Sequence, residues 1–374
     1  MQCCGFGDIA HFFINSIAVL IQTILHAMLI PRLKNNGKVT LWLNPLQLKV
    51  RKQIQDKMNS GVYEFESHQE CVICKSSSCE LIGERDRYGL YYPVNICQKC
   101  GFVFVNPRID QKSYNQFYST EYRKLYSGAE KPTDYFFQQQ YKQGERIYNF
   151  LAENNMLDSS PKSVLEVGCG AGGILLYFKE KGFEVKGIDL CEEYIEYGKK
   201  GYNLDLYTTN LQGLKLLKKP DIIIYSHVLE HLLNLEEELA LIKSICKPHT
   251  KVYIEVPSLK QMHKAYDYNI LKYFHIAHTY HFTLATLKNL LTKNGFDLVV
   301  GNEQVMSVFQ PAESASKSIT NDYDSAIAYI KKYEKLRWVY YLFPKAIKYY
   351  SGMIVIKILD RLGWKEKVKS ILGR

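Results

Sequence analysis

The second half of the chain alternates short apolar runs with longer stretches of helical periodicity. From Lys162 onward, four runs have the pattern of buried strands: VLEV (164–167), EVKGIDL (184–190), DIIIYS (221–226) and KVYIEV (251–256). Such runs are typical of a parallel sheet covered on both faces, and the segments between them are long enough for crossover helices. The pattern predicts a doubly wound α/β fold.

Outside this region, the pattern predicts helices around one cysteine-rich module. A helix is expected over 44–59, and another begins after Asn321 or Asp322, either of which can cap it. The expected parts are an N-terminal helical segment (1–62), the cysteine-rich module (63–110), a tyrosine-rich helical lid (111–158), the α/β domain (159–300) and a basic, aromatic-rich helical region (301–374).

The N-terminal segment contains a long apolar stretch, residues 9–30, that carries no formal charge. A helix of this length could cross a bilayer. Its polar residues fall within about 60° of one another on a helix; they are His11, Asn15, Gln22 and His26. A polar stripe favours a helix that lies in the membrane interface or packs on a partner. Pro31 ends the stretch, and if the stretch does span a bilayer, the cations after it place the rest of the chain inside.

Positive charge is concentrated at the other end of the chain. The formal net charge is +10, and residues 331–374 hold twelve Lys or Arg against three acids. Apolar residues are interleaved with these charges, as in MIVIKIL (353–359), so we expect a packed helix or a membrane-surface segment. No recognition-helix or RNA-binding signature is present, so nucleic acid is not an expected partner.

The two ends together predict peripheral or anchored attachment at the inner face of the cytoplasmic membrane, because stable attachment usually takes two signals. Cysteine usage agrees with this compartment. Of the ten cysteines, four form two C-x-x-C pairs, and nothing resembles a cleavable signal peptide. A reducing, cytoplasmic environment is therefore expected.

The cysteine-rich module contains CVIC (71–74) and, twenty-two residues later, CQKC (97–100). Each short knuckle points its two sulfur atoms the same way, so four thiolates come within reach of one tetrahedral ion. A thiol redox centre needs only one such pair. An all-sulfur site is closed to substrate, so the pattern predicts a structural zinc held by Cys71, Cys74, Cys97 and Cys100.

The first strand runs into the glycine-rich turn VLEVGCGAGG (164–173), where glycines 168, 170 and 173 satisfy the dinucleotide pattern G-x-G-x-x-G. Glu166, two residues before the first glycine, would repel the pyrophosphate of a dinucleotide. S-adenosylmethionine has no phosphate and carries a sulfonium and an ammonium group, which a carboxylate attracts. The turn therefore favours S-adenosylmethionine, with an NAD-dependent reductase as the alternative.

These residues resemble a known family. VLEVGCGAGG, then GIDL with Asp189, then SHVLEHL are similar to the motifs of class I S-adenosylmethionine-dependent methyltransferases over about residues 160–300. CVIC followed by CQKCGFVFVNPR resembles the zinc-ribbon segment of the subgroup that methylates sugars in glycans and natural products. The resemblance implies a Rossmann-like methyltransferase sheet preceded by a small zinc-ribbon module. It implies cofactor contacts from Glu166, Gly168, Gly170, Gly172, Asp189 (ribose), Asn210 (adenine) and His227.

Two groups of histidines are candidates for chemistry, since a sugar hydroxyl needs a base to remove its proton. The first is His227, Glu230 and His231, at the sheet edge where α/β folds bind ligands. Ubiquinone-pathway O-methyltransferases hold a divalent metal here with E-x-x-E-H, whereas this chain has H-x-x-E-H. A metal site and plain local hydrogen bonding therefore both stay open for this group.

The second group lies in FHIAHTYHF (274–282), where His278 matches a histidine of the sugar-methylating subgroup and is expected to be the general base. His227 is the second catalytic candidate. Ala277 stands where a glutamate often precedes that histidine, and the missing carboxylate favours O-methylation over C-methylation. Candidate substrate contacts, which could stack on a sugar ring or serve as packing, are Tyr114, Tyr118, Tyr122 and His281.

The expected function is S-adenosylmethionine-dependent O-methylation of a sugar, either nucleotide-activated or part of a lipid-linked glycan. The substrate partner is then a small molecule or a glycan. Two alternatives keep the same domain: a C-methyltransferase or small-molecule methyltransferase, and an inactive adaptor whose cofactor pocket survives as a scaffold.

Overall fold

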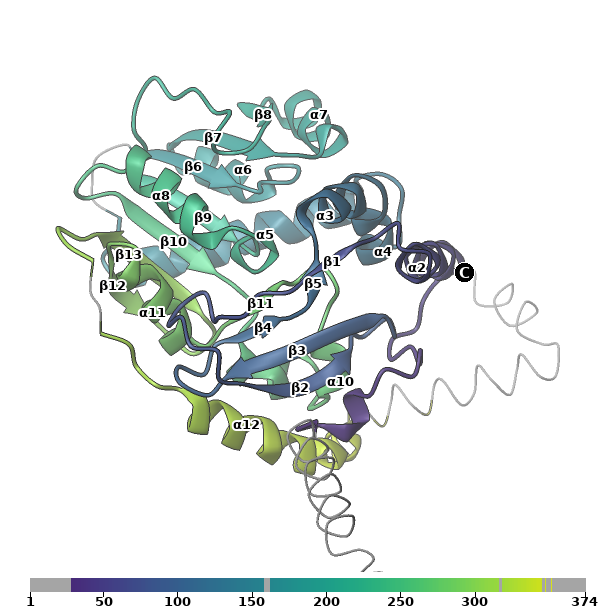
Figure 1. Ribbon diagram of the computed structural model, residues 1–374. Helices are drawn as coiled ribbons and strands as arrows, with labels where there is room; N and C mark the ends of the chain where they lie inside the picture. Colours follow the sequence, from purple (N-terminus) through teal and green to yellow (C-terminus); the bar gives the residue numbers. More distant parts are fainter. Residues whose placement is uncertain (1–27, 158–161, 316–317, 345–346, 348–350, 352–374) are drawn as a thin grey trace, which may run out of the picture.

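The computed structural model (Figure 1) describes residues 28–157, 162–315, 318–344, 347 and 351. Most of the apolar stretch 9–30 lies outside these residues. So does most of 345–374, the last part of the basic region. The last residues of the apolar stretch belong to the folded core, because the amides of Leu29 and Ile30 donate to the carbonyls of Leu81 and Ile82. Ile30 is buried, so residues 28–30 pack on the chain's own fold, and the alternatives for residues 9–27 stay predictions. In the described ranges, no helix is long and apolar enough to cross a membrane.

The predicted parallel sheet is present and has seven strands in the order β12-β13-β10-β9-β6-β7-β8. The five strands β10, β9, β6, β7 and β8 pair in parallel, whereas β13 runs antiparallel to both β10 and β12. Their bounds are β6 Ser163–Val167, β7 Glu184–Asp189, β8 Leu206–Thr208, β9 Ile222–Ser226, β10 Lys251–Glu255, β12 Phe296–Gly301 and β13 Met306–Pro311. The four apolar runs are thus confirmed as β6, β7, β9 and β10.

Alternate residues of the central strands face two helical layers. Leu165 and Ile223 pack in one cluster with the layer formed by α8 (Leu235–Ile245) and α11 (Leu284–Lys293). Val164 and Ile222 pack in another cluster with the layer formed by α5 (Asp134–Glu153), α6 (Gly173–Glu180) and α7 (Glu192–Tyr202). Since neighbouring residues of a strand point to opposite faces, strands covered on both sides must be apolar throughout. This explains why the runs in the sequence are mostly apolar on both faces.

The cysteine-rich module forms a second sheet below the first in Figure 1, with the strand order β11-β4-β3-β2. Its strands are β2 Cys79–Arg85, β3 Tyr91–Cys97, β4 Val103–Val105 and β11 Tyr280–His281. The strand β11 comes from within the α/β domain, after β10, so this sheet combines strands of the cysteine-rich module with a strand of the α/β domain. A separate two-stranded ladder joins β1 (Phe65–Glu66) to β5 (Arg108–Ile109). The module and the α/β domain are therefore tied together by backbone hydrogen bonds.

The remaining helices lie around these two sheets. The predicted helix over 44–59 is confirmed as α2 (Pro45–Asn59), where Asn44 and Gln47 form a reciprocal capping box. The lid contains α3 (Gln111–Phe117), the π-helical turn η2 (Tyr118–Tyr122) and α4 (Arg123–Ser127). The others are η1 Pro31–Leu33, η3 Leu229–His231, η4 Leu259–Gln261, α9 Met262–Ala265, α10 Ile270–Tyr273, α12 Tyr323–Leu336 and η5 Arg337–Leu342.

The predicted start of α12 is confirmed, and its two candidate caps have different roles. The side chain of Asn321 accepts from the amide of Tyr323. The carboxylate of Asp322 instead accepts from Thr283 and pairs with Lys260 at 2.7 Å. Asp322 therefore ties the C-terminal helix to the α/β domain rather than capping it.

Candidate active site

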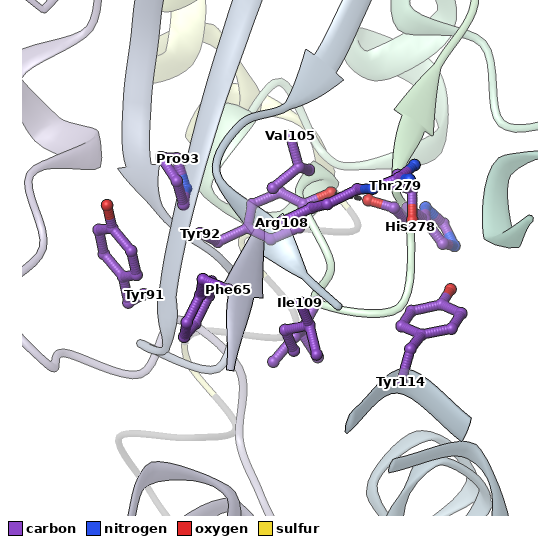
Figure 2. Close-up of a pocket in the computed structure, with 11 residues that line it drawn as sticks. Phe65, Tyr91, Tyr92, Pro93, Val105, Arg108, Ile109, Tyr114, His278 and Thr279 are labelled. Carbon is purple, nitrogen blue, oxygen red and sulfur yellow. Dashed lines mark hydrogen bonds between the residues drawn. The ribbon is translucent and has the colours of Figure 1, made fainter. Parts of the chain in front are cut away.

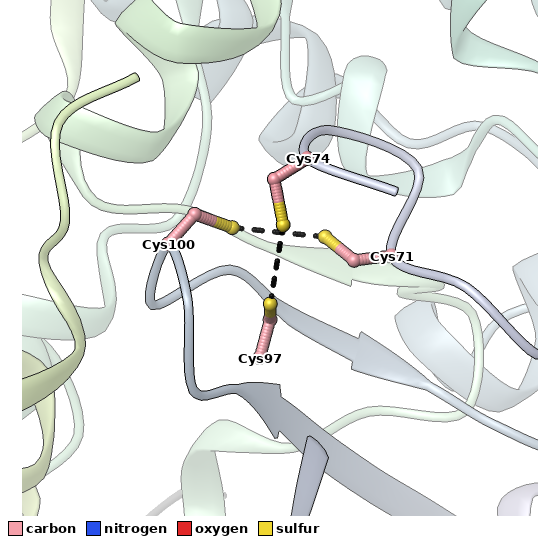
Figure 3. Close-up of side chains that lie close together, drawn as sticks. All are labelled: Cys71, Cys74, Cys97 and Cys100. Atoms are coloured by element: carbon pink, nitrogen blue, oxygen red, sulfur yellow. Dashed lines mark hydrogen bonds between the residues drawn. The ribbon is translucent and has the colours of Figure 1, made fainter. Parts of the chain in front are cut away.

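The four predicted zinc ligands meet in one cluster (Figure 3). The sulfur atoms of Cys71 and Cys100 are 3.6 Å apart, and those of Cys74 and Cys97 are 3.4 Å apart. Four sulfurs at 2.3 Å around a tetrahedral ion are about 3.8 Å from one another. The quartet therefore fits a zinc ion. It packs with core residues of the α/β domain.

The glycine-rich turn has the backbone that the cofactor prediction requires. Gly168, Gly170 and Gly172 all have positive φ, at 72°, 54° and 79°. A Cβ on Gly168 would lie 2.5 Å from Cγ2 of Val228, so no side chain fits between this turn and the residue after His227. At these three positions the backbone adopts the left-handed conformation that glycine favours, and their contact with the cofactor stays a prediction. They lie between β6 and α6, at the carboxyl edge of the sheet.

Glu166 lies beneath this turn and is only 1% exposed. Its Oε2 atom has no hydrogen-bond partner among the described residues. Burial, and then the charge of Asp189, raise the pKa of Glu166 well above its ordinary value. A buried carboxylate without a partner is costly, and a cationic ligand would relieve that cost. The structure thus places an orphaned acid where the sequence predicts a cofactor.

Asp189 ends β7 on the other side of the turn. Its Oδ2 accepts from the amide of Gly170 at 2.9 Å, and its Oδ1 accepts from the amide of Cys191 at 2.8 Å. The guanidinium of Arg123, from α4 of the lid, is 3.4 Å from Oδ2. Asn210 lies farther along, on an exposed turn after β8, where its side chain accepts from the amide of Gly213.

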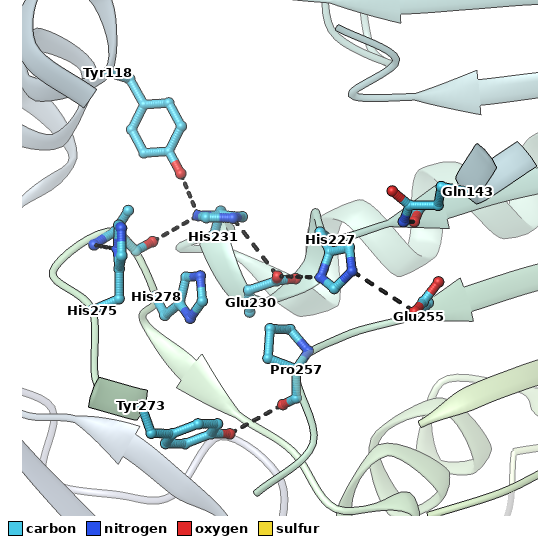
Figure 4. Close-up of polar contacts among 12 residues, drawn as sticks. Tyr118, Gln143, His227, Glu230, His231, Glu255, Pro257, Tyr273, His275 and His278 are labelled. Carbon is cyan, nitrogen blue, oxygen red and sulfur yellow. Dashed lines mark hydrogen bonds and ion pairs between the residues drawn. The ribbon is translucent and has the colours of Figure 1, made fainter. Parts of the chain in front are cut away.

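A row of polar side chains runs along the same sheet edge (Figure 4). His227 follows β9 with φ of 57°, and its Nδ1 lies 3.5 Å from Oε1 of Glu230. Oε1 of Glu230 also lies 3.7 Å from Nε2 of His231. At the other end, Nε2 of His227 is 3.8 Å from Glu255, which Arg146 of α5 holds at 2.7 Å. The row therefore alternates imidazoles with carboxylates.

The two predicted catalytic histidines have different surroundings in this row. The side chain of His227 is 44% exposed, whereas His278 is 7% exposed. Desolvation lowers the pKa of His227, but Glu230 and Glu255 outweigh it, so the pKa is raised. Burial, and then the nearby imidazoles of His231 and His275, lower the pKa of His278 well below its ordinary value. His278 is therefore neutral at pH 7.

His278 belongs to a trio with Glu230 and His231, whose ligand atoms all lie within 4.8 Å of one another. The ring of His278 lies 4.7 Å from that of His231. Nδ1 of His278 and both carboxylate oxygens of Glu230 are buried without a hydrogen-bond partner in the described residues. This arrangement can accept a proton at His278 or hold a cation among the three side chains.

The candidate substrate tyrosines lie against this cluster. The hydroxyl of Tyr114 lies 2.6 and 2.7 Å from the backbone carbonyl oxygens of His231 and Ala277, to either of which it can donate, and Tyr118 contacts Nδ1 of His231. The rings of Tyr118 and Tyr122 stack on each other at 4.5 Å. The lid therefore lies directly over the histidines. The tyrosine rings pack on one another, which is one of the two roles that their spacing in the sequence allowed.

His281 lies deeper in the structure, on β11. It is 2% exposed, and its Nε2 is 2.8 Å from the hydroxyl of Tyr92. Figure 2 shows a cavity whose lining includes His278, Arg108 and Tyr114. Its volume of about 20 Å³ is enough for a water-sized group and too small for a sugar. The cavity as it stands is therefore not an acceptor pocket.

Several residues of this edge were not predicted from the sequence. Glu255 is the next-to-last residue of KVYIEV, as Glu166 and Asp189 are of their runs. An acid near the carboxyl end of a buried strand was therefore a usable signal. Arg123 and Arg146 come from helices that precede the sheet in the chain. Their contacts depend on how those helices dock, which no local pattern encodes.

The comparisons with known proteins concern this half of the chain. The model of a family described as methyltransferase domain matches residues 136–300, a range that includes most of α5. Protein 235L of Invertebrate iridescent virus 6, a methyltransferase by name, is 30% identical over 135 residues, which are 34% of this chain and 51% of that protein. The ubiquinone biosynthesis O-methyltransferase of Rickettsia canadensis is 30% identical over 119 residues, which are 30% of this chain and 50% of that enzyme. The chain spans about half the length of the curated relatives it matches.

Solved structures are also similar to the chain. That of a 1,6-didemethyltoxoflavin-N1-methyltransferase from Burkholderia thailandensis, with S-adenosylhomocysteine bound, aligns at 16% identity and a TM-score of 0.41. The alignment covers 57% of this chain and 96% of that one. The family match favours a methyltransferase over an NAD-dependent reductase. Together with the strand order and the glycine turn, it shows that residues 136–300 form a methyltransferase domain of the class I, S-adenosylmethionine-dependent type.

Proposed function

We propose that the protein O-methylates a sugar hydroxyl, on a nucleotide-activated sugar or a lipid-linked glycan, with S-adenosylmethionine as donor. The observation that carries the proposal is the orphaned carboxylate of Glu166 beside the glycine turn, at the same sheet edge as the row of imidazoles. Glu166 and the three glycines would hold the methionine part of the cofactor, and Asp189 the ribose. The bound cofactor supplies a methyl carbon activated by the adjacent sulfonium.

The chain's own residues then have to place the acceptor and take its proton. A hydroxyl oxygen attacks the methyl carbon in line with the bond to sulfur that breaks, so alignment accounts for much of the acceleration. The hydroxyl proton moves to the base as the new carbon–oxygen bond forms. A neutral imidazole can accept it, and His278 is neutral with an unpartnered Nδ1. Glu230, within 4.8 Å, would stabilise the resulting imidazolium.

Replacing Glu166 with glutamine tests the cofactor assignment. Glutamine keeps the shape and removes the charge, so affinity for S-adenosylhomocysteine should fall about tenfold to a hundredfold, the worth of a charge-assisted hydrogen bond. In the ligand-free protein, the same substitution should instead stabilise the folded state. The pKa of Glu166 is higher in the folded than in the unfolded protein. Folding therefore becomes less favourable as the pH rises from the pKa of the unfolded state toward that of the folded state, because the buried acid then resists ionisation. Thermal unfolding of the variant should therefore match the wild type near pH 5 and exceed it increasingly toward pH 8.

Titration calorimetry with S-adenosylhomocysteine and with NADH measures the affinities. Glu192→Gln, an exposed glutamate in the first turn of α7, is the matched control and should leave both affinity and stability unchanged. An unaltered affinity in Glu166→Gln, or tight binding of NADH by the wild type, would remove the basis of the proposal.

The acceptor is the second part to test. Support for a sugar comes from the cysteine-rich module and its likeness to the zinc ribbon of sugar-methylating enzymes. The relatives named for ubiquinone biosynthesis favour O-methylation of another small molecule as the second candidate. Incubation with methyl-labelled cofactor and parallel panels of nucleotide sugars, lipid-linked glycans and phenolic quinone precursors decides between them. We expect label in a sugar panel; label only in the phenolic panel would establish the second candidate, and cofactor binding without transfer to any panel would favour the adaptor.

A further inference from the structure

One face of the molecule, away from the active site, combines a hollow with cationic and aromatic side chains. The hollow has a volume of about 160 Å³ and lies where η1, α10 and η5 meet. Its lining includes Arg32, Asp267, Lys272, Arg337, Trp338 and Tyr341. In Figure 1 this region lies at the C-terminal end of α12, at the opposite end of the molecule from β8 and α7. We call it the basic aromatic face.

The charges around the hollow are fixed in position and are net positive. Arg32 pairs with Glu334 at 3.2 Å, and Lys272 pairs with Asp267 at 2.7 Å. Arg337 shares Glu334 at the longer distance of 3.8 Å and lies over the ring of Trp338. The three cationic side chains are thus paired with only two carboxylates, which leaves a net positive charge. Exposed lysines of α12 at positions 331, 332 and 335 add to the positive field nearby.

Apolar side chains project from the same face. Six of the sixteen large apolar or aromatic side chains that are exposed in the described part of the chain lie within residues 336–347. The most exposed are Leu342 at 75% and Trp338 at 63%. Isolated exposed side chains are normal, but a cluster of this kind marks an interaction surface. Aromatic rings with adjacent cations are the composition that membrane interfaces favour.

Two further stretches of the sequence join the folded part at this face. Residues 9–27 carry no formal charge, and the chain continues from them through Met28 to Arg32 at the rim of the hollow. Residues 345–374 contain eight Lys or Arg against two acids and follow η5 after Phe343 and Pro344. In the sequence, one apolar stretch and one basic stretch therefore adjoin the described residues of this face. Stable attachment to a bilayer usually takes two such signals.

We propose that the basic aromatic face docks on an anionic membrane surface, with the exposed apolar side chains of η5 entering the interface and an anionic headgroup in the hollow. Each cation near such a surface adds attraction that salt weakens. Docking at this face does not depend on which acceptor is methylated. It has a consequence for the proposed function, because α10 on this face leads directly to the loop that carries His278, which suits a lipid-linked acceptor.

The test uses the full chain in co-sedimentation with vesicles of phosphatidylcholine alone or mixed with phosphatidylglycerol. Wild-type protein should bind the mixed vesicles, and added salt should weaken binding. Trp338→Ala/Leu342→Ala should lower the partition coefficient about tenfold or more, since both side chains lose apolar area that binding would bury. The matched control is Trp42→Ala/Leu217→Ala, which removes one tryptophan and one leucine side chain outside the basic aromatic face. These two residues are 74% and 106% exposed.

Zinc content and S-adenosylhomocysteine affinity show that each variant is folded. Three results would overturn the inference: equal binding of wild type and the Trp338/Leu342 variant, equal losses in the control, or equal binding to neutral and anionic vesicles. If wild type and the Trp338/Leu342 variant bind equally, two further measurements show what covers the face instead. A lower melting temperature in the variant would mean that the chain's own terminal residues cover the face, and loss of a dimer would mean that a second copy does.

Discussion

Replacing Cys97 with serine should remove the bound metal and unfold the cysteine-rich module. A serine hydroxyl cannot replace a thiolate in an all-sulfur quartet, and a structural zinc contributes about 10–16 kcal/mol in small zinc-binding folds. Cys97 is the last residue of β3 and is fully buried, so its loss affects both the metal and the central strand of the second sheet. Metal analysis should fall from one zinc per chain to none, with a much lower melting temperature.

Unfolding of the cysteine-rich module should also disrupt the active site. The strand β4 pairs with β11, so melting of the second sheet frees the segment that includes His281 and follows directly on His278. Methyl transfer should therefore be lost together with zinc. Cys79→Ser is the matched control, because Cys79 lies opposite Cys97 on β2 but outside the quartet. A Cys97→Ser protein with full zinc and wild-type stability, or metal loss that is equal in Cys79→Ser, would contradict the assignment. Iron in place of zinc would correct the metal alone.

Features with a local physical signature were predictable from the sequence. The strands β6, β7, β9 and β10 are largely apolar on both faces because helices cover both, and this leaves mostly apolar runs in the sequence. The cysteine quartet was predictable because the knuckle spacing alone brings two sulfurs to one ion. Glu166 was informative because its charge conflicts with the ligand that the glycine pattern otherwise suggests. In each case, the residue types within a few positions determine the outcome.

Features that depend on docking were not predictable. The strand β11 has two residues and no strand pattern of its own, and it forms because β4 offers an edge. Arg123 reaches Asp189 only because the lid folds over the sheet. The spacing of Tyr114, Tyr118 and Tyr122 suits a sugar-stacking surface and a packed helix equally well. Their burial against His231 follows from long-range packing.

The two catalytic candidates, His278 and His227, can be separated by mutation and by pH. If His278 is the base, His278→Ala should lower kcat by about 10² to 10⁴, the usual contribution of a positioned base, with cofactor affinity unchanged within a few-fold. A base must be unprotonated, so activity is lost as pH falls through its pKa. Because burial lowers the pKa of His278 below the ordinary 6.5, the acidic limb of kcat should lie below pH 6.5. The raised pKa of His227 would place that limb above pH 6.5.

The controls decide among three roles for this cluster. His249→Ala, an exposed histidine on the loop before β10 and therefore at the opposite sheet edge, should change neither kcat nor the pH profile. Near-normal turnover in His278→Ala, with loss of turnover in His227→Ala and an acidic limb above pH 6.5, would transfer the base role to His227. A chelator that abolishes turnover while the cysteine-bound zinc and the melting temperature are retained would instead mean that Glu230, His231 and His278 hold a second metal ion. In that case a divalent cation added back should restore turnover in the wild type and fail to do so in His278→Ala, because the trio then lacks one of its three ligands.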